Sequence, residues 1–193
     1  MEQPKLQWSE YVVLVDATFL DSLVLDFVKN FSAMIGRQLG KLDLCHWLDC
    51  LLLDSGITEG EHNTFVAFLH PLGAKRMSAV NPGDFKEELD GKAFSDNLGE
   101  FTLASFPIEK VTTRGEFLAD ALKAAMESES TKKILVVGDM QEYADLLCET
   151  ASGESKSEVT FFTMANLPAG KFKHQILGYS VMSGLGIRGE ELR

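Results

Sequence analysis

Two segments far apart in the chain decide its fold: residues 11–16 read YVVLVD and residues 134–139 read ILVVGD. Each is an apolar run that ends in an acid, which is typical of a buried strand with a carboxylate at its carboxyl end. In an open parallel sheet, ligands and reacting groups gather just beyond these ends. The two acids, Asp16 and Asp139, can bind a divalent metal there, and they can equally be ordinary helix caps.

The composition indicates one globular domain over residues 1–193. Hydrophobic residues make up 45% of the 193 residues and charged residues 24%, which is ordinary for a globular protein. No apolar stretch approaches the roughly 18 residues that span a bilayer, and the first residues do not resemble a signal peptide. We therefore expect a cytoplasmic protein with no membrane partner. The three cysteines predict reduced thiols rather than a disulfide framework.

Strand and helix patterns alternate, which predicts an α/β fold: a three-layer α/β/α sandwich with a mostly parallel sheet. Polar residues at about 72–99 form an excursion within this domain, and the pattern of residues 172–187 fits either a helix or a strand. The expected sheet has about five strands, near residues 11–16, 64–69, 101–106, 134–139 and 159–164. Right-handed crossovers favour the order 3-2-1-4-5, in which Asp16 and Asp139 face each other across a crevice.

Capping is the structural alternative to a metal site. An acid three residues after a helix-capping side chain is typical of a capping box, which needs no metal. This spacing occurs at Thr18 and Asp21, at Thr113 and Glu116, and at Asp139 and Glu142.

The segments around the two acids resemble the NYN branch of the PIN-like nuclease superfamily. Residues 13–19 (VLVDATF) are similar to the family's first strand, which ends in an acid, and residues 137–143 (VGDMQEY) are similar to its fourth-strand motif Ser-Gly-Asp-x-Asp-Phe. The resemblance covers about residues 11–164. The family has a third acid at the start of the helix between strands 3 and 4, where Glu116 lies in this chain.

The resemblance implies a Mg²⁺- or Mn²⁺-dependent endoribonuclease. Asp16, Asp139 and Glu116 would bind the metal, Glu142 would be a further catalytic acid, and Asp120 is an alternative third ligand. Metals held by such carboxylates activate water and stabilise the charge that develops on the phosphate.

Basic residues near the expected strand ends are consistent with RNA as a partner. The segments that we expect beyond those ends hold six Lys and Arg but only three acids, although the chain has a net charge of −11. Arg114, Lys171 and Lys173 are the candidates for contacting the RNA backbone, because neutralised phosphates supply most non-specific affinity. The acidic net charge argues against a protein whose whole surface binds nucleic acid.

Three departures from the family pattern favour a different class of function. The polar residue expected three positions after the first acid is Phe19, the second acid of the fourth-strand motif is Gln141, and the usual Asp before the third helix is absent. The alternative is a non-catalytic domain on the same scaffold that binds a protein partner or a second copy of itself. A phosphate site at the helix after Gly138 is a third hypothesis, but no Gly-rich phosphate loop supports it.

Overall fold

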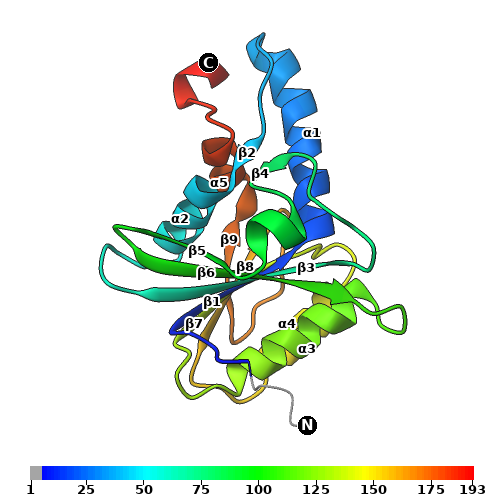
Figure 1. Cartoon of the computed structure of the whole chain (residues 1–193), viewed down its shortest axis with the longest axis vertical. Helices are drawn as coiled ribbons and strands as arrows, with labels where there is room; N and C mark the ends of the chain where they lie inside the picture. Colours follow the sequence, from blue (N-terminus) through cyan, green and yellow to red (C-terminus); the bar gives the residue numbers. More distant parts are fainter. Residues whose placement is uncertain (1–5) are drawn as a thin grey trace.

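A seven-stranded sheet runs through the middle of the molecule in the computed structural model, which describes residues 6–193 (Figure 1). In spatial order its strands are β5 (Lys92–Asp96), β6 (Gly99–Ile108), β3 (Asn63–Pro71), β1 (Tyr11–Asp16), β7 (Lys133–Val137), β8 (Glu158–Thr163) and β9 (Lys173–Ile176). The β5–β6 pair is antiparallel, and the other neighbouring pairs are parallel.

The α/β class and the mostly parallel sheet are confirmed, whereas the expected five-stranded sheet is wrong in its size and its complete order. Strands β6, β3, β1, β7 and β8 are consecutive, and β5 and β9 extend the sheet at its two edges. Both edge strands are short and mostly exposed. They therefore lack the apolar run from which a buried strand is predicted.

Helices cover both faces of the sheet (Figure 1). One layer contains α1 (Ala17–Ile35), α2 (Leu44–Asp54) and α5 (Leu177–Gly184), and the other contains α3 (Arg114–Met126) and α4 (Ala144–Ala151). The sheet thus separates two apolar cores, one around Trp47 and Phe162 and one around Leu118 and Phe161. A short 3₁₀-helix, η2 (Gly189–Leu192), follows α5. Among residues 6–193 no helix has both the length and the apolar character needed to cross a membrane.

The central position of β1 places its last residue at the point where the two halves of the sheet diverge. All six residues of β1 are buried, because the strand has a neighbour on each side and a helical layer on each face. Asp16 pairs in register with Leu69 of β3, and Val15 pairs with Val137 of β7. The carboxyl ends of β1 and β7 therefore lie side by side, which is where the sequence predicts a site.

The excursion at residues 72–99 is ordered and lies against α1. It contains β4 (Val80–Asn81), which pairs with β2 (Leu42–Asp43) in a separate two-stranded sheet, the π-helical turn η1 (Phe85–Leu89), and β5. Asp21 of α1 accepts hydrogen bonds from the backbone N–H groups of Ser78 and Ala79. Asp21 therefore fixes this excursion instead of completing a cap with Thr18.

Candidate functional site

Asp16 is the centre of the candidate site. Its side chain is only 2% exposed, yet it is an acid at the end of an apolar strand. Oδ1 accepts the N–H of Phe19 at 3.1 Å, so Asp16 itself, rather than Thr18, is the N-cap of α1. Oδ2 accepts a hydrogen bond from Arg114 Nη1 at 2.9 Å and another from the Tyr143 hydroxyl at 2.5 Å. A buried carboxylate needs such partners, because its desolvation is otherwise very costly.

Arg114 connects this buried acid to the surface. It is the first residue of α3, and its guanidinium donates from Nη1 to Asp16 and from Nη2 to Glu142 at 2.8 Å. The Arg114 side chain is 27% exposed and that of Glu142 is 60% exposed. Burial alone would lower the pKa of Arg114, but the charge and hydrogen bond of Asp16 together with the neighbouring Tyr143 and Glu142 outweigh burial, and the pKa is raised. Arg114 therefore stays cationic and neutralises Asp16.

Tyr143 completes the polar network from the other side. Its hydroxyl donates to Asp16 and accepts the backbone N–H of Asp139 at 2.7 Å. Burial and the neighbouring charge of Asp16 raise the pKa of Tyr143 well above its usual range, so the hydroxyl keeps its proton and remains a donor. The ring fits against two glycines: a Cβ added to Gly138 would lie 2.7 Å from the Tyr143 hydroxyl oxygen, and one added to Gly115 would lie 2.8 Å from Tyr143 Cβ.

Asp139 lies at the end of β7 as expected, but it belongs to a turn. Its Oδ1 accepts the N–H of Gln141 at 3.1 Å. A cap at Asp139 would start a helix at residue 140, but α4 begins only at Ala144, with Tyr143 as an N-cap that makes no side-chain capping bond. The capping box proposed for Asp139 and Glu142 is therefore wrong, and Glu142 binds Arg114 instead.

Glu116 is the acid of a complete capping box. Its carboxylate accepts the N–H of Thr113 at 2.9 Å, and the Thr113 hydroxyl oxygen accepts the N–H of Glu116 at 3.2 Å. The hydrogen bond from the Thr113 backbone holds the pKa of Glu116 below its usual value. This confirms the capping alternative at Glu116 and leaves its carboxylate turned back onto its own helix end. Asp120, the alternative third acid, lines a different hollow.

The residues at the strand ends do not fit a Mg²⁺ or Mn²⁺ ion. Within residues 6–193, no three His, Cys, Asp or Glu side chains are arranged so as to hold one. Both oxygens of Asp16 already accept hydrogen bonds, and the Arg114 cation lies beside Oδ2. Carboxylates that bind these ions need free lone pairs and an open position. A hollow of about 350 Å³ beside Asp139 is lined by Phe19, Asp26, Gln141 and Met164 among others, and no basic side chain of the described residues lines it.

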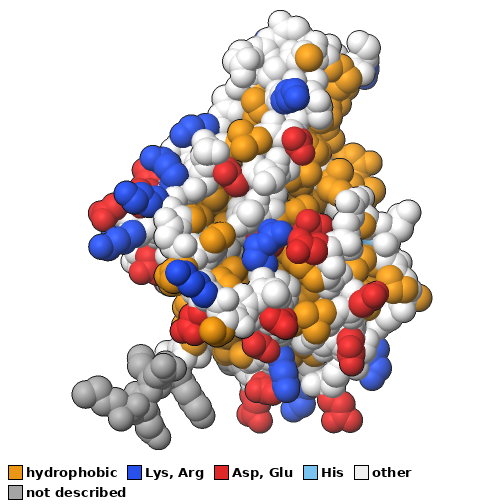
Figure 2. Space-filling view, turned by 90° about the vertical axis from the view of Figure 1, so that its right-hand side faces the viewer, with side chains coloured by type: hydrophobic (Ala, Val, Ile, Leu, Met, Phe, Trp, Pro, Cys, Tyr) orange, Lys and Arg blue, Asp and Glu red, His pale blue; other side chains and the backbone are white. Residues whose placement is uncertain are grey.

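The basic residues that the sequence predicts around the strand ends do not gather there. Lys173 begins β9 and forms an ion pair with Glu158, the first residue of β8, at 2.8 Å. Lys171 lines a small hollow with Ser155 and Ser157, which precede β8. Both lysines therefore lie near the amino end of β8, because the chain runs back along the sheet before β9. On the face that Figure 2 presents, Lys and Arg lie among Asp and Glu rather than in one basic area.

The structure thus unites Asp16, Arg114, Glu142, Tyr143 and the backbone of Asp139, while Glu116, Lys171 and Lys173 lie apart. Tyr143 is the residue that sequence reasoning missed. The available signal was an aromatic residue four positions after a strand-end acid, with a glycine before that acid. The arrangement holds β1, β7 and the segments that lead into α3 and α4 together at the sheet's carboxyl end.

The cysteines are free, as the sequence predicts, and all three are half-buried. Cys50 and His46 lie one turn apart on α2, and both contact Ser183 of α5. Burial raises the pKa of the Cys50 thiol, so the thiol stays protonated. A neutral thiol is a poor nucleophile, and we assign these contacts to the packing of α2 on α5.

A second pair of acids lies between α2 and β5. Burial, followed by the neighbouring Asp96, raises the pKa of Asp49 to about 7. Asp49 Oδ1 is also buried without a hydrogen-bond partner within residues 6–193. The ionised form of Asp49 is therefore disfavoured in the folded protein.

Asp49→Asn is expected to raise the free energy of unfolding by about 1 kcal/mol at pH 8 and to change it little near pH 4.5. The folded-state pKa lies above the unfolded value of roughly 4, so the penalty for ionising Asp49 grows as the pH rises through this interval. We reduce the expected effect because the side chain is partly exposed. Urea denaturation of both proteins at the two pH values measures it, and an equal effect at both would contradict the assignment.

Comparisons with known proteins give one match. No curated protein and no solved structure matches the chain. A family model described as a family of unknown function, DUF6621, matches residues 5–192. Because this match spans almost the whole sequence, the chain belongs to the family of unknown function DUF6621.

Proposed function

We propose that this protein is a non-catalytic binding domain built on a scaffold related to the PIN-like nucleases. The observation that carries the proposal is the state of Asp16, whose carboxylate is buried and bound by Arg114, Tyr143 and the N–H of Phe19. In a metal-dependent nuclease the equivalent acid would be free to bind the ion. Here it contributes to a neutralised network that holds strands and helices together.

The arrangement of the acids argues against metal-dependent cleavage. Such catalysis needs two or three carboxylates that converge on the ions which activate water. Glu116 caps its own helix, Glu142 is bound to Arg114, and Asp139 accepts a bond within its own turn. Each acid is therefore used in a local structural contact.

The suggested relation to PIN-like proteins rests on the middle of the sheet. The order β6-β3-β1-β7-β8 is the 3-2-1-4-5 order that right-handed crossovers favour. The two acids that carry the family resemblance are Asp16, the last residue of β1, and Asp139, two residues after β7. The edge strands β5 and β9 would be additions to that scaffold. Strand order supports a common architecture, but it carries no activity by itself.

A Mn²⁺ titration followed by calorimetry tests the proposal. We expect no saturable binding to the wild-type protein up to about 5 mM, because Arg114 already neutralises Asp16. Asp16→Asn combined with Asp139→Asn is the control for any weak binding. Binding in the micromolar to low-millimolar range that disappears in the double variant would overturn the proposal.

A ribonuclease remains the second candidate, favoured by the adjacent positions of Asp16 and Asp139 at the ends of β1 and β7. It requires Arg114 to leave Asp16 when substrate and metal bind. Cleavage of single-stranded RNA in Mn²⁺ that depends on Asp16 would establish it. We expect no cleavage above that of the Asp16→Asn protein.

A further inference from the structure

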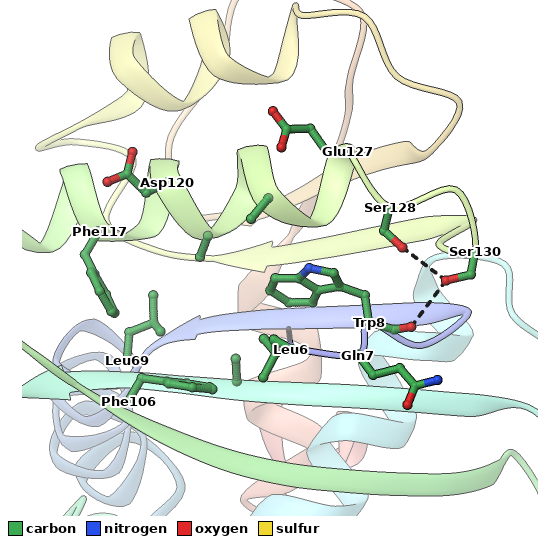
Figure 3. Close-up of a pocket in the computed structure, with 13 residues that line it drawn as sticks. Leu6, Gln7, Trp8, Leu69, Phe106, Phe117, Asp120, Glu127, Ser128 and Ser130 are labelled. Atoms are coloured by element: carbon green, nitrogen blue, oxygen red, sulfur yellow. Dashed lines mark hydrogen bonds between the residues drawn. The ribbon is translucent and has the colours of Figure 1, made fainter. Parts of the chain in front are cut away.

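A large apolar groove lies on the other side of the molecule from α1, between α3 and the strands β3 and β6 (Figure 3). We call it the α3 groove and define it by Trp8, Ala67, Phe106, Phe117, Ala121 and Ala124. Its volume is about 1040 Å³. None of the residues that form the Asp16 network lines it.

The groove exists because one helical layer is incomplete. Among residues 6–193, only α3 and α4 cover this face of the seven-stranded sheet, and the connection from β3 to β6 contributes η1 and β4 to the core on the opposite face. Helix α3 packs against β1, β3 and β7, so the sheet beside α3 is left without a helix of the described chain. Small side chains at Ala67, Ala121 and Ala124 deepen the hollow instead of filling it.

The walls of the groove are held in place by contacts within the protein. The Trp8 indole lies edge-on to Phe65, with ring centroids 5.7 Å apart, and lies between α3 and the strands (Figure 3). The Ser130 hydroxyl donates a hydrogen bond to the Trp8 carbonyl oxygen at 3.3 Å. It also shares a hydrogen bond with the Ser128 hydroxyl at 3.0 Å. These bonds attach the segment before β1 to the chain that follows α3, so the aromatic wall is pre-formed.

The charged side chains of residues 6–193 that line the groove are both acidic. Asp120 of α3 and Glu127, the C-cap of α3, stand at the rim and are both exposed, and among residues 6–193 no Lys or Arg lines the groove (Figure 3). Within residues 6–193 neither acid forms an ion pair. The two acids are seven residues apart, which corresponds to about 10 Å along a helix, and so they lie on the same side of α3. A ligand that covers the apolar floor would therefore present positive charge to this rim.

We propose that the α3 groove binds an amphipathic helix of a partner protein, with an apolar stripe that faces the sheet and Lys or Arg residues that face Asp120 and Glu127. This deepens the proposed binding function and rests on it. Such a helix would lie beside α3 and complete the helical layer, as in other helix-in-groove complexes.

The dimensions of the groove match a helix of about three turns. The residues of α3 and its C-cap that line the groove extend from Phe117 to Glu127, a span of about 15 Å. Helices pack with their axes roughly 8–10 Å apart, and the small side chains of Ala121 and Ala124 permit such an approach. An open trough of this length, acidic along one rim, fits a helix better than a compact small molecule.

The test uses two stapled helical peptides of about 15 residues with the same leucine stripe, one flanked by lysines and the other by glutamates. Stapling removes the ordering cost of a short helix. The ¹⁵N-labelled protein offers two indole N–H signals: Trp8 lines the groove, whereas Trp47 is fully buried in the opposite core. We expect the lysine peptide to shift the Trp8 signal with a Kd below about 100 μM and to leave Trp47 unchanged.

Two substitutions of the protein locate the peptide. Ala124→Phe fills the groove at an exposed position of α3 and is expected to weaken binding at least about tenfold. Ala33→Phe makes the same change at an exposed position of α1, on the other side of the sheet, and should have no effect. Asp120→Lys combined with Glu127→Lys is expected to reverse the preference toward the glutamate peptide.

Three results would overturn the proposal. The Trp8 signal could stay unchanged up to about 1 mM lysine peptide, a concentration at which even a weak specific complex would form. Binding could be insensitive to Ala124→Phe, which would place the peptide elsewhere. Octyltrimethylammonium ion could shift Trp8 at the same or lower concentration, which would make the groove a site for small amphiphilic cations. None of these results depends on Mn²⁺, so they are distinguishable from a failure of the proposed non-catalytic function.

Discussion

Arg114→Ala is expected to lower the free energy of unfolding by about 3 kcal/mol, because it leaves the buried Asp16 carboxylate without its cation. The carboxylate would keep only the Tyr143 hydroxyl and the N–H of Phe19 as donors. The expected loss lies at the lower end of the range for a broken buried ion pair, since the Arg114 side chain is 27% exposed and water can enter. Urea denaturation at pH 7 measures the change.

A double-mutant cycle separates the ion pair from the packing of Arg114. Asp16→Asn removes the charge that Arg114 neutralises, so Arg114→Ala should cost at least about 1 kcal/mol less in that background. Glu142→Gln is the matched control, because it removes the exposed partner of the same guanidinium and should cost less than about 0.5 kcal/mol. An equal cost of Arg114→Ala in both backgrounds would show that Asp16 does not depend on Arg114.

The interior of the sheet could be predicted because each buried strand has its own local signal. The runs at residues 11–16 and 134–139 are apolar whichever elements surround them, and the expected alternation with helices then limits the topology. Strand β9 has no such signal, since its residues Lys173–Ile176 are all exposed and only its pairing with β8 makes it a strand. Strand β5 likewise depends on a hairpin with β6.

The candidate site was predictable in position but not in chemistry. The sequence places an acid at the end of β1, yet the partners of Asp16 are 98 and 127 residues away in the chain. A strand-end acid looks the same whether a metal or an arginine neutralises it. The distinction depends on α3 beginning with Arg114, whose side chain lies within hydrogen-bonding distance of Asp16. No local pattern contains this tertiary relation. The capping box of Glu116 could be predicted because its two residues, Thr113 and Glu116, are only three positions apart in the sequence.

The α3 groove could not be predicted for a similar reason. Its wall joins Trp8, from the segment before β1, to Phe106 of β6 and to Ala121 of α3. In the sequence these residues look like ordinary core positions, and Asp120 looks like a surface acid. They form a groove because residues 6–193 place no further helix over β6 on this face.

The largest expected loss of stability is at the turn between β5 and β6, which positions one strand of the groove floor. Gly99 has a φ of +103°, and a Cβ added there would lie 2.1 Å from the carbonyl oxygen and 2.4 Å from the nitrogen of His62. Gly99→Ala is therefore expected to lower the free energy of unfolding by about 4 kcal/mol, since backbone strain and overpacking add.

Gly91→Ala is the matched control, because Gly91 lies at the other end of β5 with a φ of +70° and has no atom within 4 Å of an added Cβ. Gly91→Ala should lower the free energy of unfolding by only about 1 kcal/mol, the cost of holding an alanine in the left-handed conformation. Urea denaturation, followed by circular dichroism, compares the two proteins. Equal losses would mean that only the backbone conformation matters and that β6 is not held against His62. A loss confined to Gly99→Ala would establish that this close contact fixes the edge of the sheet on which the groove is built.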